Sequence, residues 1–170
     1  RVYWYFGARG EDRPGRAEQL CAAFDPAVGE LVALTPPQEI LVHRLYDRDP
    51  AKSWSRGAVT LLGDAAHPML PFIGQGACAA LEDAVVLGQA AAAQGDPAAA
   101  LAAYERARVK RAALFVKTSR QAAAIALPRS PFARRVRNAL LPLVPEAARL
   151  RQFKPFLEWA PEGLGAARAN

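Results

Sequence analysis

The sequence predicts an α/β fold, more narrowly an α+β fragment, on three observations. Aromatic and β-branched runs at residues 1–7 and 39–47 are typical of strands. The apolar run at residues 59–62 stops at a Gly-Asp pair, and Ala-rich segments with helical spacing follow at 77–93 and 98–125. A chain of 170 residues with 52% hydrophobic and 22% charged residues is long enough for a packed core and is not of the disordered type.

The first 50 residues are expected to contribute strands and two short helices. Arg1 to Gly7 forms a strand in which Trp4 or Tyr5 faces a ligand or, as is commoner for a single aromatic residue, packs against a neighbouring strand. Apolar residues at spacings of three and four predict a short amphipathic helix from Arg16 to Phe24. Asp25-Pro26 ends it, and a second helical stretch runs from Glu30 to Ala33.

The strand expected from Glu39 to Asp47 carries candidates for the wall of a site, namely Arg44, Tyr46 and Arg48. The alternative is a solvated strand edge with paired charges, and we prefer it for Arg48, with Asp47 or Asp49 as its partner. His43 has no histidine, cysteine or carboxylate at ligand spacing, so we assign it no chemistry and predict no metal site.

The stretch from Val59 to Ala84 combines features that suit a ligand. Val59 to Leu62 is predicted to be a short buried strand, which leaves Asp64 at its carboxyl end, where open α/β sheets bind ligands. Gly74 and Gly76 then introduce a helix whose first residues are small. Its free N–H groups therefore form a positively polarised surface that a flat ligand could approach. The alternative is a simple turn followed by a connection that the glycines shape.

The helices that follow are expected to pack side by side. Leu81, Val85 and Gly88 are predicted to form the packing face of the first helix, which ends at Gln94-Gly95. Asp96 caps the second helix, with Pro97 at its first position. In the second helix we expect Glu105 to pair with Arg108 and expect one stack of side chains at spacings of three and four: Tyr104, Arg108, Arg111 and Phe115.

The carboxyl-terminal part is strongly basic, since residues 101–170 hold 14 Lys and Arg against 4 acidic residues. Such asymmetry can indicate a nucleic-acid or membrane-surface partner. Arg134, Arg135 and Arg137 are interleaved with apolar residues like the solvent face of a helix, and no aromatic ladder accompanies them. We therefore predict no nucleic-acid partner, and a terminal helix in residues 153–159 that packs back on the body.

Cellular context is predicted from the cysteines and from hydropathy. Cys21 and Cys78 are too few for a disulfide framework, which indicates reduced thiols in a cytoplasmic protein, and Cys78 is expected to act as a small apolar helix residue. No apolar run is expected to reach the length of a membrane span.

The motif Gly63-Asp64-Ala65-Ala66-His67-Pro68, with Pro71, Gly74-Gln75-Gly76 and Glu82-Asp83-Ala84, resembles the second flavin-binding motif of the FAD-dependent aromatic hydroxylases. These salicylate hydroxylase-like proteins are single-component flavoprotein monooxygenases. The resemblance implies FAD as cofactor and NAD(P)H as co-substrate. It also implies O₂-dependent hydroxylation of an aromatic or similarly electron-rich small molecule; epoxidation and halogenation are not separable from hydroxylation on these residues.

The same resemblance implies roles for individual residues. Asp64 matches the aspartate that holds a ribityl hydroxyl of FAD, and the other cofactor-binding candidates are Gly63, Pro71, Gly74, Gln75, Gly76 and Ala77. The candidates for the substrate wall are Trp4, Tyr46 and Phe72. His67 is expected to pack the loop. No catalytic side chain is expected, because the flavin carries the chemistry.

The resemblance also predicts how the chain is divided. Residues 1–50 would belong to the substrate-binding sheet domain, 51–95 to the carboxyl-terminal part of the FAD-binding domain, and 96–170 to a helical region. The chain does not begin with Met and has no Gly-x-Gly-x-x-Gly after an amino-terminal strand, so we expect a fragment without the amino-terminal Rossmann unit. The alternative function is a catalytically silent piece that completes a flavin site only with a separate amino-terminal half.

Overall fold

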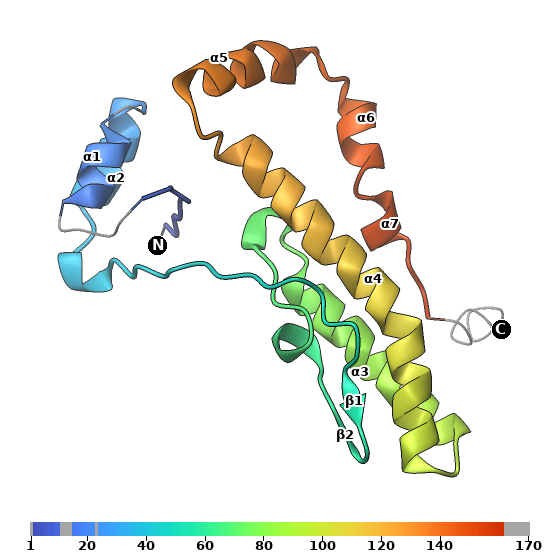
Figure 1. The fold of residues 1–170 in the computed structure, drawn as a ribbon. Helices are drawn as coiled ribbons and strands as arrows, with labels where there is room; N and C mark the ends of the chain where they lie inside the picture. The colour runs from blue at the N-terminus through green and yellow to red at the C-terminus, as the bar shows by residue number, and fades with distance from the viewer. Residues whose placement is uncertain (1, 11–14, 23, 162–170) are drawn as a thin grey trace, which may run out of the picture. The chain divides into compact units, whose positions relative to one another are not determined.

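A computed structural model describes residues 2–10, 15–22 and 24–161 (Figure 1). The described residues are mostly helical, with one two-stranded antiparallel sheet. Contacts divide the chain into two compact units, residues 1–45 and 46–170, and each is described by itself. The three-part division at residues 50 and 95 stays a prediction.

The first unit contains two short α-helices and a 3-10 turn, α1 (Arg16–Cys21), α2 (Pro26–Ala33) and η1 (Pro37–Glu39). Asp25 caps α2 by accepting a hydrogen bond from the Ala27 N–H at 3.0 Å. The predicted second helix is present and ends at Ala33 as expected, but it begins at Pro26 rather than Glu30, and α1 ends at Cys21, short of the predicted Phe24.

Neither strand predicted in the first 47 residues is present among the described residues. Residues 2–7 form no strand, and Arg1 lies outside the described part of the chain. Residues 40–47 also form no strand. Strands exist through hydrogen bonds to a neighbouring strand, and no such neighbour occurs for either segment within the described residues. The aromatic run packs locally instead, because the Trp4 indole stacks on Phe6 at 5.8 Å and donates to Thr35 Oγ1 at 3.0 Å.

The second unit begins with a hairpin. The strands β1 (Ser55–Arg56) and β2 (Val59–Thr60) pair antiparallel, with Ser55 opposite Thr60. Val59 is 68% exposed, so the prediction of a buried strand over residues 59–62 is wrong; only Val59 and Thr60 form the strand, and residues 60–62 are partly buried. After β2 the chain continues through two 3-10 turns and a series of helices: η2 (Gly63–Ala65), η3 (Pro71–Ile73), α3 (Gly76–Ala93), α4 (Pro97–Ala126), α5 (Pro131–Leu140), η4 (Leu141–Leu143), α6 (Glu146–Arg151) and α7 (Lys154–Leu157).

The helices α3 and α4 lie side by side and form the body of the second unit (Figure 1). As predicted, Asp96 caps α4, accepting from the Ala99 N–H at 2.9 Å, and Pro97 takes the first position. Buried residues gather in two clusters along α4. One contains Trp54, Ala66, Tyr104 and Ala112, and the other contains Ile73, Ala79, Phe115 and Phe156.

The packing face predicted for α3 is wrong. Leu81 is 67% exposed, Val85 is exposed, and a methyl group added at Gly88 would meet open space. The buried face instead carries Ala79 and Asp83. The polar side chain of Asp83 faces α4 because Arg108 of that helix donates a hydrogen bond to it, while Val86, Leu87 and Ala90 of α3 pack against the cluster around Trp54 and Tyr104.

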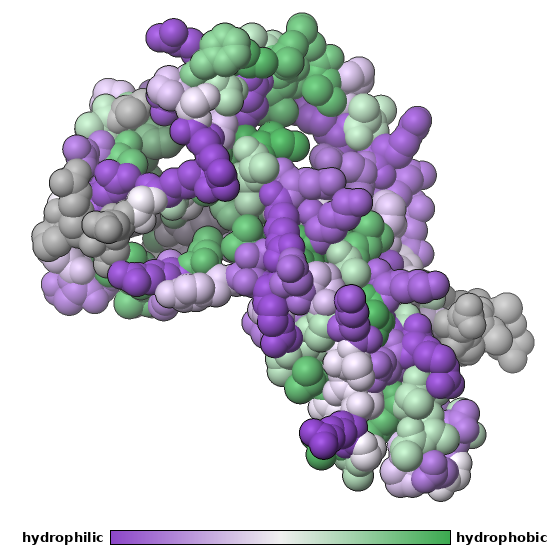
Figure 2. All heavy atoms as spheres, viewed as in Figure 1, coloured by the Kyte–Doolittle hydropathy of each residue, from purple (hydrophilic) through white to green (hydrophobic). Residues whose placement is uncertain are grey.

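The first and the last of the carboxyl-terminal helices, α5 and α7, both contact α4. Arg137 of α5 donates to the carbonyl oxygens of Ile125 and Ala126 at 3.1 and 2.7 Å. Phe156 of α7 is buried against Phe115, with ring centroids 4.8 Å apart, which confirms the predicted packing of residues 153–159 on the body. Arg134 and Arg135 are exposed, as expected for a solvent face. Apolar side chains also remain at the surface over α5 (Figure 2), Phe132 among them.

One helix among the described residues, α3, is long and apolar enough to cross a membrane by length and composition alone. The expectation that no segment reaches this length is therefore wrong. Glu82 and Asp83 lie near the middle of α3 and form ion pairs with Arg108 and Arg111 of α4, so this face of the helix contacts protein.

We predict that Gly63→Ala lowers the free energy of unfolding by about 1–3 kcal/mol, because Gly63 has φ +58° and its added methyl group would lie 3.2 Å from Cβ of Ala80. Urea unfolding measures this change. Gly88→Ala is the matched control, since Gly88 lies in α3 with open space around it. This substitution should raise the free energy of unfolding by roughly 0.5–1 kcal/mol. Equal effects of the two substitutions would contradict the prediction.

Candidate functional site

The candidate site is built around η2, the turn that carries Asp64. Gly63 takes a left-handed conformation, and its carbonyl oxygen accepts hydrogen bonds from the N–H groups of Ala66 and His67, both at 2.9 Å. Asp64 is exposed, and its carboxylate has no hydrogen-bond or ion-pair partner among the described residues. The turn therefore presents a free carboxylate on a closed backbone loop.

The turn is fixed from behind by the buried carboxylate of Asp83 on α3. Its Oδ2 accepts from the Gly63 N–H at 3.0 Å and from His67 Nε2 at 2.6 Å, and its Oδ1 accepts from Arg108 Nε at 2.6 Å. Burial alone would raise the pKa of Asp83, but the hydrogen bonds from His67, Gly63 and Arg108 outweigh burial and hold this pKa below its ordinary value. Asp83 is therefore ionised and accepts from all three donors.

His67 acts as a structural donor. An ionised carboxylate only accepts hydrogen bonds, so the proton of the imidazole lies on Nε2, facing Asp83. The other ring nitrogen, Nδ1, is buried without a hydrogen-bond partner in the described part of the protein. The predicted loop-packing role is confirmed, because His67 is fully buried with its ring 5.5 Å from that of Trp54.

A second carboxylate, Glu82, completes the polar contact between α3 and α4. It accepts from Arg108 at 2.7 Å and from two nitrogens of Arg111 at 2.5 and 2.6 Å. The Trp159 ring covers both guanidinium groups, at 5.3 and 4.8 Å from its centroid. Two acids on α3 thus balance two arginines on α4, and the predicted pairing of Glu105 with Arg108 is wrong.

Arg48 holds the same loop from the other side. Its guanidinium donates to the carbonyl oxygens of Ala65 and Ala66 at 2.7 and 3.0 Å. The pairing preferred for Arg48, with Asp47 or Asp49, is wrong, because both of these carboxylates bind Arg120 of α4.

The amino end of α3 forms the second part of the candidate site. Its N-cap residue, Gln75, makes no side-chain hydrogen bond to the helix, whereas Asp96 and Ser130 cap α4 and α5. The first N–H groups of α3, from Gly76 onward, therefore have neither an intrahelical acceptor nor a side-chain cap. Gly74 precedes them with φ +65° and open space where a side chain would stand.

The structure places the remaining predicted site residues as follows. Pro71 is exposed and Phe72 half-buried in η3, and the Ser119 hydroxyl of α4 donates to the Leu70 carbonyl oxygen just before this turn. Ala77 and Cys78 are exposed in the first turn of α3, so Cys78 presents its thiol to solvent. Tyr46 is 74% exposed in the second unit, while Trp4 lies in the first unit with its indole bound to Thr35.

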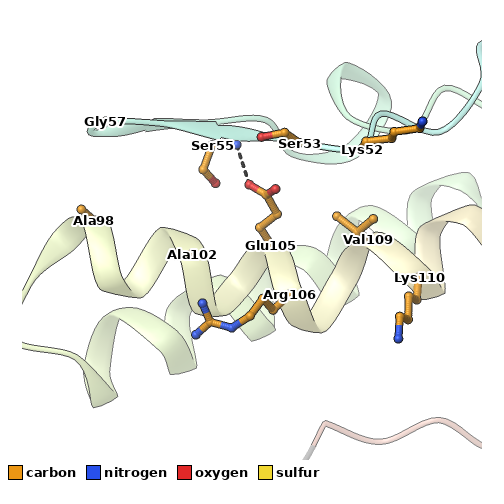
Figure 3. A pocket seen from close by; sticks show the side chains of 10 residues that line it. All are labelled: Lys52, Ser53, Ser55, Gly57, Ala98, Ala102, Glu105, Arg106, Val109 and Lys110. Atoms are coloured by element: carbon orange, nitrogen blue, oxygen red, sulfur yellow. Dashed lines mark hydrogen bonds between the residues drawn. The ribbon is translucent and has the colours of Figure 1, made fainter.

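An open groove of about 800 Å³ lies between the hairpin and α4 (Figure 3). Glu105 points from α4 across this groove, and its carboxylate accepts from the Ser55 N–H at 2.7 Å. None of the residues that the sequence assigns to a cofactor lines the groove. The groove is therefore separate from the Asp64 turn and the amino end of α3.

Sequence reasoning named Asp83 within the motif and Arg48 as a wall candidate, but it missed that both hold the Asp64 turn. For Asp83 a signal was present, since Glu82 and Asp83 are an acidic pair within an otherwise apolar helix. Such a pair needs partners, and Arg108 and Arg111, three residues apart on one face of the next helix, supply them. For Arg48 there was no signal, because backbone carbonyl acceptors are invisible in a sequence.

A family model described as "FAD binding domain" matches residues 1–119. Among similar proteins, aurachin C monooxygenase/isomerase of Stigmatella aurantiaca is 38% identical over 148 residues, which cover 83% of this chain and 39% of that protein. The 3-hydroxybenzoate 6-hydroxylase of Klebsiella oxytoca is 50% identical over 76 residues, which cover 44% of this chain and 19% of that protein.

A solved structure shares the fold. A variant of Klebsiella pneumoniae HpxO complexed with FAD superimposes with a TM-score of 0.76 and 32% identity, covering 89% of this chain and 40% of that one. The chain thus spans two fifths or less of the length of each of these proteins.

We predict that stability falls steeply below about pH 4, because the folded pKa of Asp83 is lowered from its ordinary value of 3.8. The stability that such a group contributes is fully present above its unfolded pKa and is lost as the pH falls through its folded pKa. Urea unfolding at a series of pH values from 7 to 2.5 measures this dependence.

Two variants check the assignment to Asp83. Asp83→Asn should be less stable at pH 7 by about 3–5 kcal/mol, since it removes one of the two carboxylates that pair with the buried Arg108, and should show a flatter acid dependence. Glu158→Gln, which removes an exposed carboxylate on the same unit, should follow the unsubstituted chain. An Asp83→Asn profile parallel to that of the unsubstituted chain would rule out the assignment.

Proposed function

Because the chain belongs to the FAD binding domain family, we propose that it is the FAD-binding portion of a flavoprotein monooxygenase. The enzyme uses NAD(P)H and O₂ to hydroxylate an aromatic or similar small molecule. The observation that carries the proposal is the free carboxylate of Asp64 on a turn that packs against α3, the helix whose amino end is uncapped.

The residues present suit FAD. The Asp64 carboxylate is an acceptor for a ribityl hydroxyl, and it has no competing partner among the described residues. The uncapped N–H groups at the start of α3 suit the electron-rich pyrimidine edge of the ring system. Gly74 leaves room for a flat ring to approach the backbone, since nothing lies within 4 Å of where its side chain would stand, and at Gly76 the Met69 side chain is 3.9 Å from that position.

The chain's own residues would bind, orient and shield the cofactor, with Gly63, Gln75 and Ala77 contributing backbone to the same site. Bound FAD supplies the redox chemistry. Pro71 and Phe72 of η3, together with buried Ile73, would wall the site and keep water from it. Asp64 would hold the ribityl chain, and no side chain of this segment is assigned a proton transfer.

The substrate we propose is a small aromatic or electron-rich molecule, in keeping with the hydroxybenzoate named for one relative. Tyr46, Phe72 and Trp4 stay the candidates for its wall. We propose a cytoplasmic location and no nucleic-acid partner, supported by two free thiols and by arginines exposed on α5 without an aromatic ladder.

The chain spans 39% of one relative and 40% of the FAD-bound structure. We propose that residues corresponding to the unmatched parts of these proteins complete the active site. The alternative is that this piece is silent unless it pairs with a separate amino-terminal half. Mixing the two separately expressed halves discriminates between the proposals. NAD(P)H oxidation that appears only in the mixture supports complementation, and its absence from a mixture that binds FAD contradicts it.

We predict saturable FAD binding by this chain, followed through flavin fluorescence and visible absorbance. Asp64→Ala should weaken binding by about 10- to 100-fold, because a hydrogen bond to a charged group contributes roughly 1.5–3 kcal/mol. Asp64→Asn keeps one acceptor oxygen and should give an intermediate loss.

The matched control is Glu146→Ala, which removes an exposed carboxylate at the start of α6. It should leave FAD binding unchanged. Equal affinity in Asp64→Ala and the unsubstituted chain would remove Asp64 from the site, and absence of binding by a folded chain would count against a flavin site formed by this chain alone.

A further inference from the structure

One carboxylate oxygen holds both ends of the turn that presents Asp64. Oδ2 of Asp83 accepts from the Gly63 N–H, one residue before Asp64, and from the His67 ring, three residues after it. Asp83 and His67 are fully buried, whereas Asp64 between the two anchor points is exposed. The backbone of the turn is thus pinned to α3 while the Asp64 side chain remains available to a ligand.

We propose that His67 and Asp83 are positioning residues that fix the Asp64 turn in the conformation that binds the ribityl chain of FAD. This inference rests on the proposed flavin function. Neither residue touches the ligand in this proposal. Each acts through the backbone of residues 63–67.

The geometry favours positioning over simple packing. Gly63 is held in a left-handed conformation, and its carbonyl oxygen accepts hydrogen bonds from two N–H groups. The direction of the Asp64 side chain therefore depends on where this turn lies against α3. The His67 donor joins the far end of the turn to the same oxygen as Gly63 at 2.6 Å. A loop held in its binding conformation loses less entropy when the ligand binds, so loss of this anchor should appear as weaker binding.

The chain offers a matched comparison in Glu82, the residue next to Asp83. Glu82 also pairs with arginines of α4 but makes no hydrogen bond to residues 63–67. Substitutions at Glu82 therefore disturb the contact between the two helices without touching the turn. A general loss of stability and a loss of positioning are separable on this basis.

The experiment compares His67→Phe, His67→Gln and Glu82→Gln with the unsubstituted chain. Phe keeps a ring against Trp54 but removes the donor, whereas the Gln amide can place an N–H near the position of Nε2. Two quantities are measured for each variant: amide hydrogen exchange of residues 63–67 without ligand, and the dissociation constant of FAD.

His67→Phe should speed exchange at the Ala66 and His67 amide positions and weaken FAD binding, each by about tenfold or more. His67→Gln should restore most of the protection from hydrogen exchange and most of the FAD affinity. Glu82→Gln should leave both within about twofold of the unsubstituted chain, even where its unfolding midpoint falls. If His67→Phe does not fold, His67→Asn replaces it, because the shorter amide does not reach Asp83.

The outcomes separate this inference from the proposed function. Unchanged exchange at residues 63–67 in His67→Phe, or unchanged FAD affinity in a variant of a chain that binds FAD, overturns the positioning role and leaves the flavin site standing. Equal losses in Glu82→Gln and His67→Phe also overturn it, since they indicate general destabilisation. Absence of FAD binding by every chain, with faster exchange confined to His67→Phe, counts against the proposed function instead and leaves Asp83 and His67 as anchors of the turn alone.

Discussion

The buried carboxylate of Asp83 is the interaction on which the second unit depends. A charge in a protein interior costs several kcal/mol unless it is paired and hydrogen-bonded. Asp83 receives a guanidinium from α4, an imidazole from the loop and a backbone N–H from η2, so three segments far apart in sequence meet at two oxygens. Removal of any one donor leaves the carboxylate less well compensated and so weakens the contacts that the other donors make.

This arrangement divides the polar groups into two sets. Asp83, His67 and Arg108, which fix the backbone from the interior, are buried and hydrogen-bonded to one another, and Glu82 and the Trp159 ring contact the guanidinium groups of Arg108 and Arg111. Those that are free to bind a ligand, the Asp64 carboxylate and the first N–H groups of α3, lie outside this network at the surface. A rigid polar interior beside unpartnered surface groups is what a preorganised binding site requires.

The sequence predicted the local features of this structure and missed the long-range ones. The start of α4 follows from Asp96 and Pro97, because a cap and a first-turn proline act within four residues. The strands expected at residues 1–7 and 39–47 depend on neighbours that no local pattern supplies, and they are not formed among the described residues. Asp64 could be singled out because its motif is contiguous, whereas the meeting of Gly63, His67, Asp83 and Arg108 spans 46 residues and obeys no spacing rule.

The polarity of α3 explains two further differences at once. Helices on a protein surface usually turn their apolar residues inward and their charges to solvent. In α3 the only two charged residues face α4, and Leu81 and Val85 face outward. A prediction that places Leu81 and Val85 in the core therefore chooses the wrong face, although Val86, Leu87 and Ala90 of the same helix do pack against the core. Because α3 has so few charges, its composition as well as its length would allow it to span a membrane. Its two acids nevertheless form ion pairs with arginines of the neighbouring helix. The ion pairs of Glu82 and Asp83 thus determine which face of α3 lies against α4.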